Sequence, residues 1–105
     1  MALKDLQIAS ELRRRVAEVA QVVSFKVFGS RARGDADECS DLDVFIVVES
    51  LNRQLKDRII DIVWEVGFEN YMVISPLIVT RDEIENTPLR SSSIIERIAE
   101  EGVAV

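Results

Sequence analysis

Hydrophobic and polar positions follow the periods of regular secondary structure in the first half of the chain. From residue 3 to 22, apolar side chains recur every three or four positions, which predicts an amphipathic helix. Residues 24–28 are mostly apolar and stop at Gly29, and residues 42–48 are apolar on both faces over their later half. Both segments are therefore predicted to be buried strands of an α/β sheet. The small and polar residues 30–40 between them predict a loop with room for one helical turn.

The same alternation of helix and strand continues beyond the second strand. A helix is predicted over residues 51–66, where the apolar stripe returns, with Gly67 as its C-terminal stop. Residues 71–79 form the third predicted strand. Pro76 lies within that strand and indicates an edge position or a bulge, because proline cannot donate a ladder hydrogen bond.

Two polar signals mark helix starts after the third strand. Thr80 and Glu83 have the spacing of a capping box, which predicts a short helix beginning there. Thr87 and Pro88 supply the N-cap and the first position of a final helix that ends near Gly102. The three residues that follow are open to two interpretations, either a short edge strand or partner contact, or a frayed end.

The order of these elements predicts an α/β fold. Helix, strand, loop, strand, helix, strand and helix follow one another, as in a small sandwich of three to four strands flanked by helices. No repeat, linker or change of composition divides the chain. Residues 1–105 are therefore predicted to form a single domain.

Composition excludes several classes of function. Of the 105 residues, 19 are acidic and 13 are basic, and the resulting net charge of −6 argues against direct binding to nucleic acid. The chain has no histidine, which removes Ser-His-Asp catalysis and histidine-ligated zinc. Cys39 is the only cysteine, so no internal disulfide can form. The pattern predicts neither a membrane-spanning segment nor a signal peptide, and a cytoplasmic location is expected.

A pair of carboxylates at a strand start is the first candidate for chemistry. Asp41 and Asp43 are two positions apart, so their side chains leave the same face of the predicted strand. Such a pair can converge on one divalent ion, or bridge two ions about 3.5 to 4 Å apart. Oxygen ligands favour magnesium or manganese over zinc. Asp41 and Asp43 are therefore the candidate metal ligands and catalytic residues.

The segment before these carboxylates has the composition of a phosphate-binding loop. Gly29 ends a predicted strand and lets backbone N–H groups approach a phosphate, while Ser30 adds a hydroxyl donor. Arg31 or Arg33 can clamp phosphate oxygens with a guanidinium. The residues after Gly34 lack the lysine that a P-loop requires, so that motif is rejected. These four residues, from the glycine to Arg33, are the candidate nucleotide-binding set.

The combination of motifs is more specific than either part. Gly29 and Ser30 are followed after ten residues by Asp41 and Asp43, with Gly-Ser-Arg-Ala-Arg-Gly-Asp-Ala as the first run and Ser-Asp-Leu-Asp as the second. This combination resembles the minimal nucleotidyltransferases of the DNA polymerase β superfamily. The resemblance implies a mixed sheet flanked by helices, ATP or another nucleoside triphosphate as donor, and Mg²⁺ (or Mn²⁺) on the two aspartates. It also implies that the glycine and serine hold the triphosphate.

The resemblance extends to an expected partner. Family members of this size are frequently antitoxins encoded beside a HEPN ribonuclease toxin, and some transfer AMP to a tyrosine of that toxin. The resemblance thus implies an antitoxin that adenylylates a HEPN partner, in a homo- or hetero-oligomer. A small-molecule transferase would normally need an additional domain and ranks last.

One departure from the family pattern concerns turnover. Active members usually carry a third carboxylate on the strand after the second helix, but residues 71–79 contain no acid. Ser75 or Ile74 is near the expected place, and Glu69 lies just before the strand. Either Glu69 substitutes, or a partner supplies the group, or catalysis is weak or absent. The alternative function is a stoichiometric binding antitoxin on a degenerate transferase fold.

The aromatic residues Trp64, Phe68 and Tyr71 have two interpretations. They are expected in the core or at its rim, because the chain is only 6% aromatic. The alternative is an aromatic platform on which a base stacks.

Overall fold

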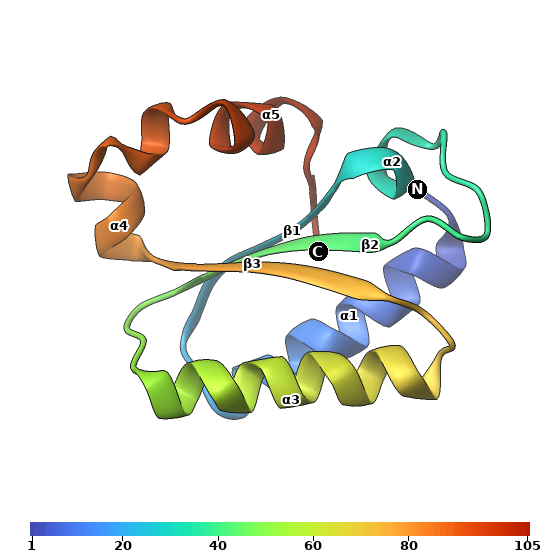
Figure 1. The fold of residues 1–105 in the computed structure, drawn as a ribbon, viewed down its shortest axis with the longest axis horizontal. Helices are drawn as coiled ribbons and strands as arrows, with labels where there is room; N and C mark the ends of the chain where they lie inside the picture. Colours follow the sequence, from blue (N-terminus) through green and yellow to red (C-terminus); the bar gives the residue numbers. More distant parts are fainter.

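The computed structural model describes all 105 residues and places a four-stranded sheet between two layers of helices (Figure 1). The helices are α1 (Leu3–Ala17), α2 (Gly29–Arg33), α3 (Arg53–Glu69), α4 (Arg81–Asn86), the 3₁₀ turn η1 (Pro88–Ser91) and α5 (Ser93–Glu101). The strands are β1 (Val22–Phe28), β2 (Leu42–Val48), β3 (Ile74–Thr80) and β4 (Val103–Ala104). None of the helices is long and apolar enough to cross a membrane.

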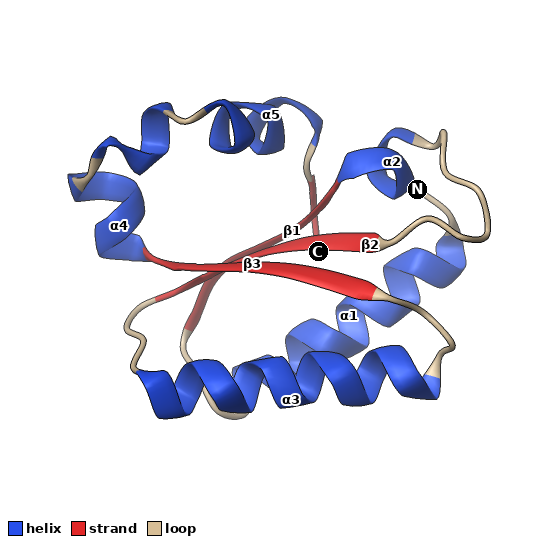
Figure 2. Ribbon diagram, in the orientation of Figure 1, coloured by secondary structure: helices blue, strands red, loops and turns tan.

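The sheet is mixed, as predicted. Its strand order is β3-β2-β1-β4, with β1 antiparallel to both β2 and β4, and β2 parallel to β3. The parallel pair is joined through α3, which crosses one face of the sheet (Figure 2). The C-terminal residues form the edge strand β4 rather than a frayed end, because Val105 donates its N–H to the carbonyl of Phe25 at 3.0 Å.

Each face of the sheet has its own apolar core. Val44 and Ile46 of β2 pack in the larger cluster, with side chains of α1 and α3. Phe45 and Val47, which alternate with them, pack in a smaller cluster with Ile98 of α5. Side chains alternate along a strand, so Asp43 points to the same face as Phe45 and Val47. The candidate site therefore belongs to the face that α4 and α5 cover.

Two predicted helix ends were wrong. The first helix stops at Ala17 rather than residue 22, and a tight turn through Val19 leads into β1. Gly67 does not stop α3, which continues to Glu69. The glycine instead permits a close packing, because a Cβ on Gly67 would lie 2.6 Å from the carbonyl oxygen of Met72.

The C-terminal capping signals were correct in part. Thr80 and Glu83 form the capping box at the start of α4. Thr87 and Pro88 begin the separate turn η1 instead of the final helix. Ser92 caps α5 by accepting a hydrogen bond from the N–H of Ile95. The predicted final helix is thus two segments, and β3 begins at Ile74, three residues later than expected.

Candidate functional site

The two candidate metal ligands lie where three strands meet. Asp43 is in β2, with Phe28 at the end of β1 opposite it on one side and Ser75 of β3 on the other. Asp41 precedes β2 and accepts a hydrogen bond from the Ser75 hydroxyl, with 3.2 Å between Oγ and Oδ2. Neither aspartate forms an ion pair within the chain. Both carboxylates are therefore left with capacity for an external ligand.

Gly29 brings the backbone at the start of α2 against the Asp43 carboxylate. Its φ is +75°, a left-handed conformation that residues with a side chain rarely adopt. A Cβ at this position would overlap Oδ2 of Asp43 and would lie 3.3 Å from Cγ. Only glycine therefore fits both the conformation and the space, which is a stricter requirement than the phosphate approach expected from the sequence.

The start of α2 carries hydrogen-bond donors that the chain leaves free. The first N–H groups of any helix have no intrahelical acceptor, and Phe28 at the N-cap has no side-chain oxygen to accept from them. The Ser30 hydroxyl makes no hydrogen bond within the chain, either as donor or as acceptor. Amide and hydroxyl donors at a helix start are the groups that bind phosphate oxygens. Gly29 and Ser30 thus present the donor set expected of them.

The electrostatics of the aspartate pair suit a cation. Partial burial raises the pKa of Asp43 above its usual value, and the negative charge of Asp41 raises it further. Arg33 acts in the opposite direction and lowers the pKa of Asp43. The chain thus holds two carboxylates together without neutralising them, and a divalent cation with oxygen ligands fits this donor set.

The β3 residue that contacts the aspartate pair is Ser75, which carries no carboxylate. No group of three or more acidic, cysteine or histidine side chains is positioned to hold a metal ion. Glu69, the substitute considered above, belongs to α3 and is bound to Arg15 of α1, with 2.7 Å between Oε2 and Nη2. Asp82 and Glu83 lie in the first turn of α4, beyond the other end of β3. The chain itself therefore supplies two carboxylates, and Glu69 is not the third.

The two candidate arginines differ in what they bind. Arg31 is nearly buried, with 10% of its side chain exposed, and pairs with the buried Asp5 of α1 at 3.0 Å. Its other donors go to backbone carbonyls of Asp37, Glu38 and Ser40. All of these bonds lie within the chain, and they tie the loop before Asp41 to α1 and α2.

Arg33 remains accessible. It is partly exposed and forms surface ion pairs with Asp35 at 3.1 Å and with Glu101 of α5 at 3.0 Å. Exposed pairs of this kind are weak and are easily exchanged for another anion. Of the two arginines, Arg33 is the one whose side chain is accessible to a phosphate.

Sequence reasoning missed two residues of the site. Asp5 was detectable, because an acid on the apolar stripe that continues through Ala9, Leu12 and Val16 must find a buried partner. Ser75 was noted only as standing near the place of a missing acid, and its bond to Asp41 depends on strand register that no local pattern specifies.

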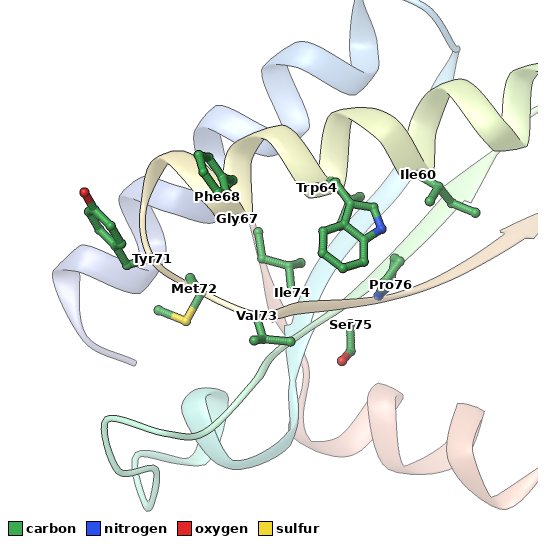
Figure 3. Close-up of a pocket in the computed structure, with 11 residues that line it drawn as sticks. Ile60, Trp64, Gly67, Phe68, Tyr71, Met72, Val73, Ile74, Ser75 and Pro76 are labelled. Atoms are coloured by element: carbon green, nitrogen blue, oxygen red, sulfur yellow. The ribbon is translucent and has the colours of Figure 1, made fainter.

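The aromatic residues are not in the core, contrary to expectation. Trp64, Phe68 and Tyr71 have exposed fractions of 74%, 85% and 99%. They lie along α3 and the turn after it (Figure 3), and α3 covers the face of the sheet opposite to the one to which Asp43 points. They therefore form a separate surface.

Comparison with known families matches residues 7–105 to the nucleotidyltransferase domain. A relative from Methanocaldococcus jannaschii, named "Putative protein adenylyltransferase", is 33% identical over 94 residues, which cover 80% of this chain and 95% of the relative. The chain belongs to the nucleotidyltransferase domain family. At the level of this family, its function is that of a nucleotidyltransferase-like enzyme.

Solved structures share the predicted α/β fold. A "putative nucleotidyltransferase" from Sulfolobus solfataricus has a TM-score of 0.59 at 18% identity, over 97% of this chain and 79% of that one. A toxin–antitoxin solved with AMP-PNP has a TM-score of 0.57 at 17% identity, over 93% and 69%. A mutant of the toxin–antitoxin MntA-HpeT gives 0.56 at 16% identity, over 95% and 70%. At these identities the likeness shows the fold alone.

Proposed function

We propose that this protein transfers AMP from ATP to a hydroxyl of a partner protein, and that the partner is a HEPN-type toxin whose activity the transfer suppresses. The observation that carries the proposal is the contact of Gly29 with the Asp43 carboxylate, which sets the phosphate donors of α2 beside the aspartate pair. The family and the adenylyltransferase name of the relative support the reaction class. Two structural neighbours are toxin–antitoxins, which supports a toxin as partner.

The roles of the residues follow from their positions. The amide groups at Gly29 and the hydroxyl of Ser30 bind phosphate oxygens, and Arg33 adds positive charge at the rim. Asp41 and Asp43 would hold Mg²⁺ or Mn²⁺, which neutralises phosphate charge and favours attack at phosphorus. In the transfer, the acceptor oxygen bonds to the α-phosphorus, the bond to the β-phosphate oxygen breaks, and pyrophosphate leaves.

The transfer requires a general base that accepts the proton of the acceptor hydroxyl, and neither Ser75 nor Glu69 can be this base. The Ser75 hydroxyl is neutral and too weak a base to accept the proton, and Glu69 is held by Arg15 in the helix layer on the other face of the sheet. We therefore assign the base to the partner or to solvent. The same observation favours a second candidate function, a stoichiometric binding antitoxin that retains the fold with reduced turnover.

A transfer assay separates the two functions. The protein is incubated with ATP, Mg²⁺ and the protein encoded in the adjacent reading frame, and the intact masses of both chains are measured. Gain of AMP on the partner is expected, and its loss is expected in Asp41→Asn/Asp43→Asn. The control Glu85→Gln/Glu100→Gln removes two exposed, unpaired charges elsewhere and should retain transfer. A stable complex without any mass change would favour the binding antitoxin.

A further inference from the structure

An apolar groove lies between α3 and the outer edge of β3, next to the nucleotide site. Its volume is about 600 Å³, and eight of its eleven lining residues are hydrophobic. Ile60, Trp64 and Phe68 project from α3, while Val73 and Ile74 form the opposite wall (Figure 3). The groove is thus a concave, largely apolar surface built from two rigid elements.

The groove exposes aromatic side chains that folding normally buries. Trp64, Phe68 and Tyr71 are three of the six aromatic residues of the chain, and all three are mostly exposed. Water does not favour a contiguous apolar surface, and such a surface on a folded domain marks a site of contact. The exposed aromatic cluster therefore indicates a binding surface.

Tyr71 is placed there at a conformational cost. It has a φ of +52°, in the left-handed position that follows α3, where glycine or asparagine is usual. The N–H of the next residue, Met72, bonds to the carbonyl of Gly67 at 2.9 Å and completes the helix ending. Since the ring is almost fully exposed, no internal contact repays the strain. A contact made by the ring with another molecule explains why a tyrosine stands here.

Within the segment that lines the groove, the charges have one sign. The segment 60–76 contains three carboxylates and no lysine or arginine. Glu69 is paired with Arg15, but Asp61 and Glu65 are exposed and have no ion-pair partner. A molecule that fills the groove must therefore bring positive charge to its flanks. A nucleotide or a second copy of this acidic chain would bring the wrong sign.

The edge of β3 disfavours an added strand. Leu42 of β2 donates its N–H to the carbonyl of Val73 at 2.9 Å, so the backbone of Val73 faces β2. By the alternation of a ladder, the backbone of Pro76 faces outward, where its missing N–H interrupts the edge. A strand laid on this edge would lose its central hydrogen bond. A helix, which needs only side-chain contact, fits better.

Ser75 of the edge strand β3 connects the groove with the aspartate pair on the other face of the sheet. Ser75 lines the groove, and its hydroxyl bonds to Asp41. We propose that the groove seats an apolar helix of the protein acceptor, with lysine or arginine residues flanking that helix toward Asp61 and Glu65. The proposal rests on the proposed function for the identity of the partner. It makes the groove the element that brings the acceptor beside the aspartate pair.

Binding measurements with exposed-residue variants test the proposal. Titration calorimetry with the protein encoded in the adjacent reading frame should show affinity at least tenfold weaker for Trp64→Ala, as for a buried interface anchor. Tyr71→Gly should bind more weakly yet melt at a higher temperature, because glycine relieves the left-handed strain. Misfolding cannot produce that combination. Leu3→Ala, an exposed apolar residue of α1, is the control and should bind normally.

Charge is tested separately by Asp61→Lys/Glu65→Lys. This variant should weaken binding, and the difference from the unmodified protein should shrink as salt is raised. Emission from Trp64, the only tryptophan, should shift to shorter wavelength when the partner fills the groove. Normal binding by all groove variants, or failure of the partner to bind at all, would overturn the proposal. So would sedimentation showing that these residues mediate self-association instead.

The transfer assay distinguishes this inference from the proposed function. If AMP transfer occurs at an unchanged KM in Trp64→Ala, the groove is not the docking surface and the reaction stands. If the complex depends on the groove but no AMP is transferred, the docking surface stands and the proposed reaction fails.

Discussion

Replacing Gly29 by alanine tests the central contact of the site. The added methyl group would occupy the space of the Asp43 Oδ2 atom, and the backbone would have to keep a φ of +75°. Because the obstructing atom is the end of a side chain, the carboxylate can rotate away. The fold should survive, while the metal and phosphate groups lose their alignment.

Two terms set the magnitude for Gly29→Ala. A left-handed alanine costs about 1 to 2 kcal/mol. Forcing Asp43 out of its preferred rotamer adds about 0.5 to 1.5 kcal/mol. At about 4 to 8 °C per kcal/mol for a domain of this size, the melting temperature should fall by roughly 6 to 28 °C. Magnesium-dependent ATP binding should weaken by about 10- to 100-fold, as when a group that orients a metal ligand is removed.

Gly34→Ala provides the matched control. Gly34 has a φ of +86°, but a Cβ there would meet nothing within 4 Å. This variant has only the cost of the left-handed backbone conformation, so its melting temperature should fall. Its ATP binding should stay close to that of the unmodified protein. Calorimetry with ATP and Mg²⁺ gives the affinities, and circular dichroism gives the melting temperatures. Equal ATP affinities for the two variants would refute the role assigned to the Gly29 contact.

Three further variants probe the site. Without metal, Asp43→Asn should raise the melting temperature at pH 7, because it removes a partly buried charge that is repelled by Asp41. Because the folded-state pKa of Asp43 is raised, its ionised form costs stability above that pKa, so the gain should vanish on acidification through it. Asp5→Ala should cost about 3 to 5 kcal/mol in urea unfolding by leaving Arg31 buried and unpaired, and a loss below 1 kcal/mol would contradict this. Ser75→Asp should lower stability without metal and raise Mn²⁺ affinity about tenfold in calorimetric titration; unchanged affinity would place Ser75 outside the metal site.

Local pattern sufficed to predict most of the fold. The strand β2 was predicted with its observed ends, because seven mostly apolar residues bounded by polar ones have few alternatives. Pro76 correctly indicated an edge strand, since only an edge tolerates a missing donor. The end of α3 was wrong because Gly67 permits close packing against Met72, and the local sequence contains no sign of that contact.

The site was less accessible to sequence reasoning. Asp41 and Asp43 were identified as candidates by their spacing, which local geometry converts directly into a shared face. The ion pair of Arg31 with Asp5 was not predicted, because the two residues are 26 positions apart and only the folded chain brings them together. The exposure of Trp64 could not be predicted either, because helical periodicity does not show which apolar face of a helix is covered by another part of the chain.

The ion pair between Asp5 of α1 and Arg31 of α2 also affects how far the N-terminus can be shortened without loss of the site's structure. Similarity to the family starts at residue 7, whereas Asp5 lies before it. A chain trimmed to the region of similarity would keep the glycine, the serine and both aspartates, yet lose the residue that anchors Arg31 and, through its carbonyl contacts, the loop leading to Asp41. In this protein the first turn of the N-terminal helix supports the loop that leads to Asp41, although it lies outside the region of family similarity.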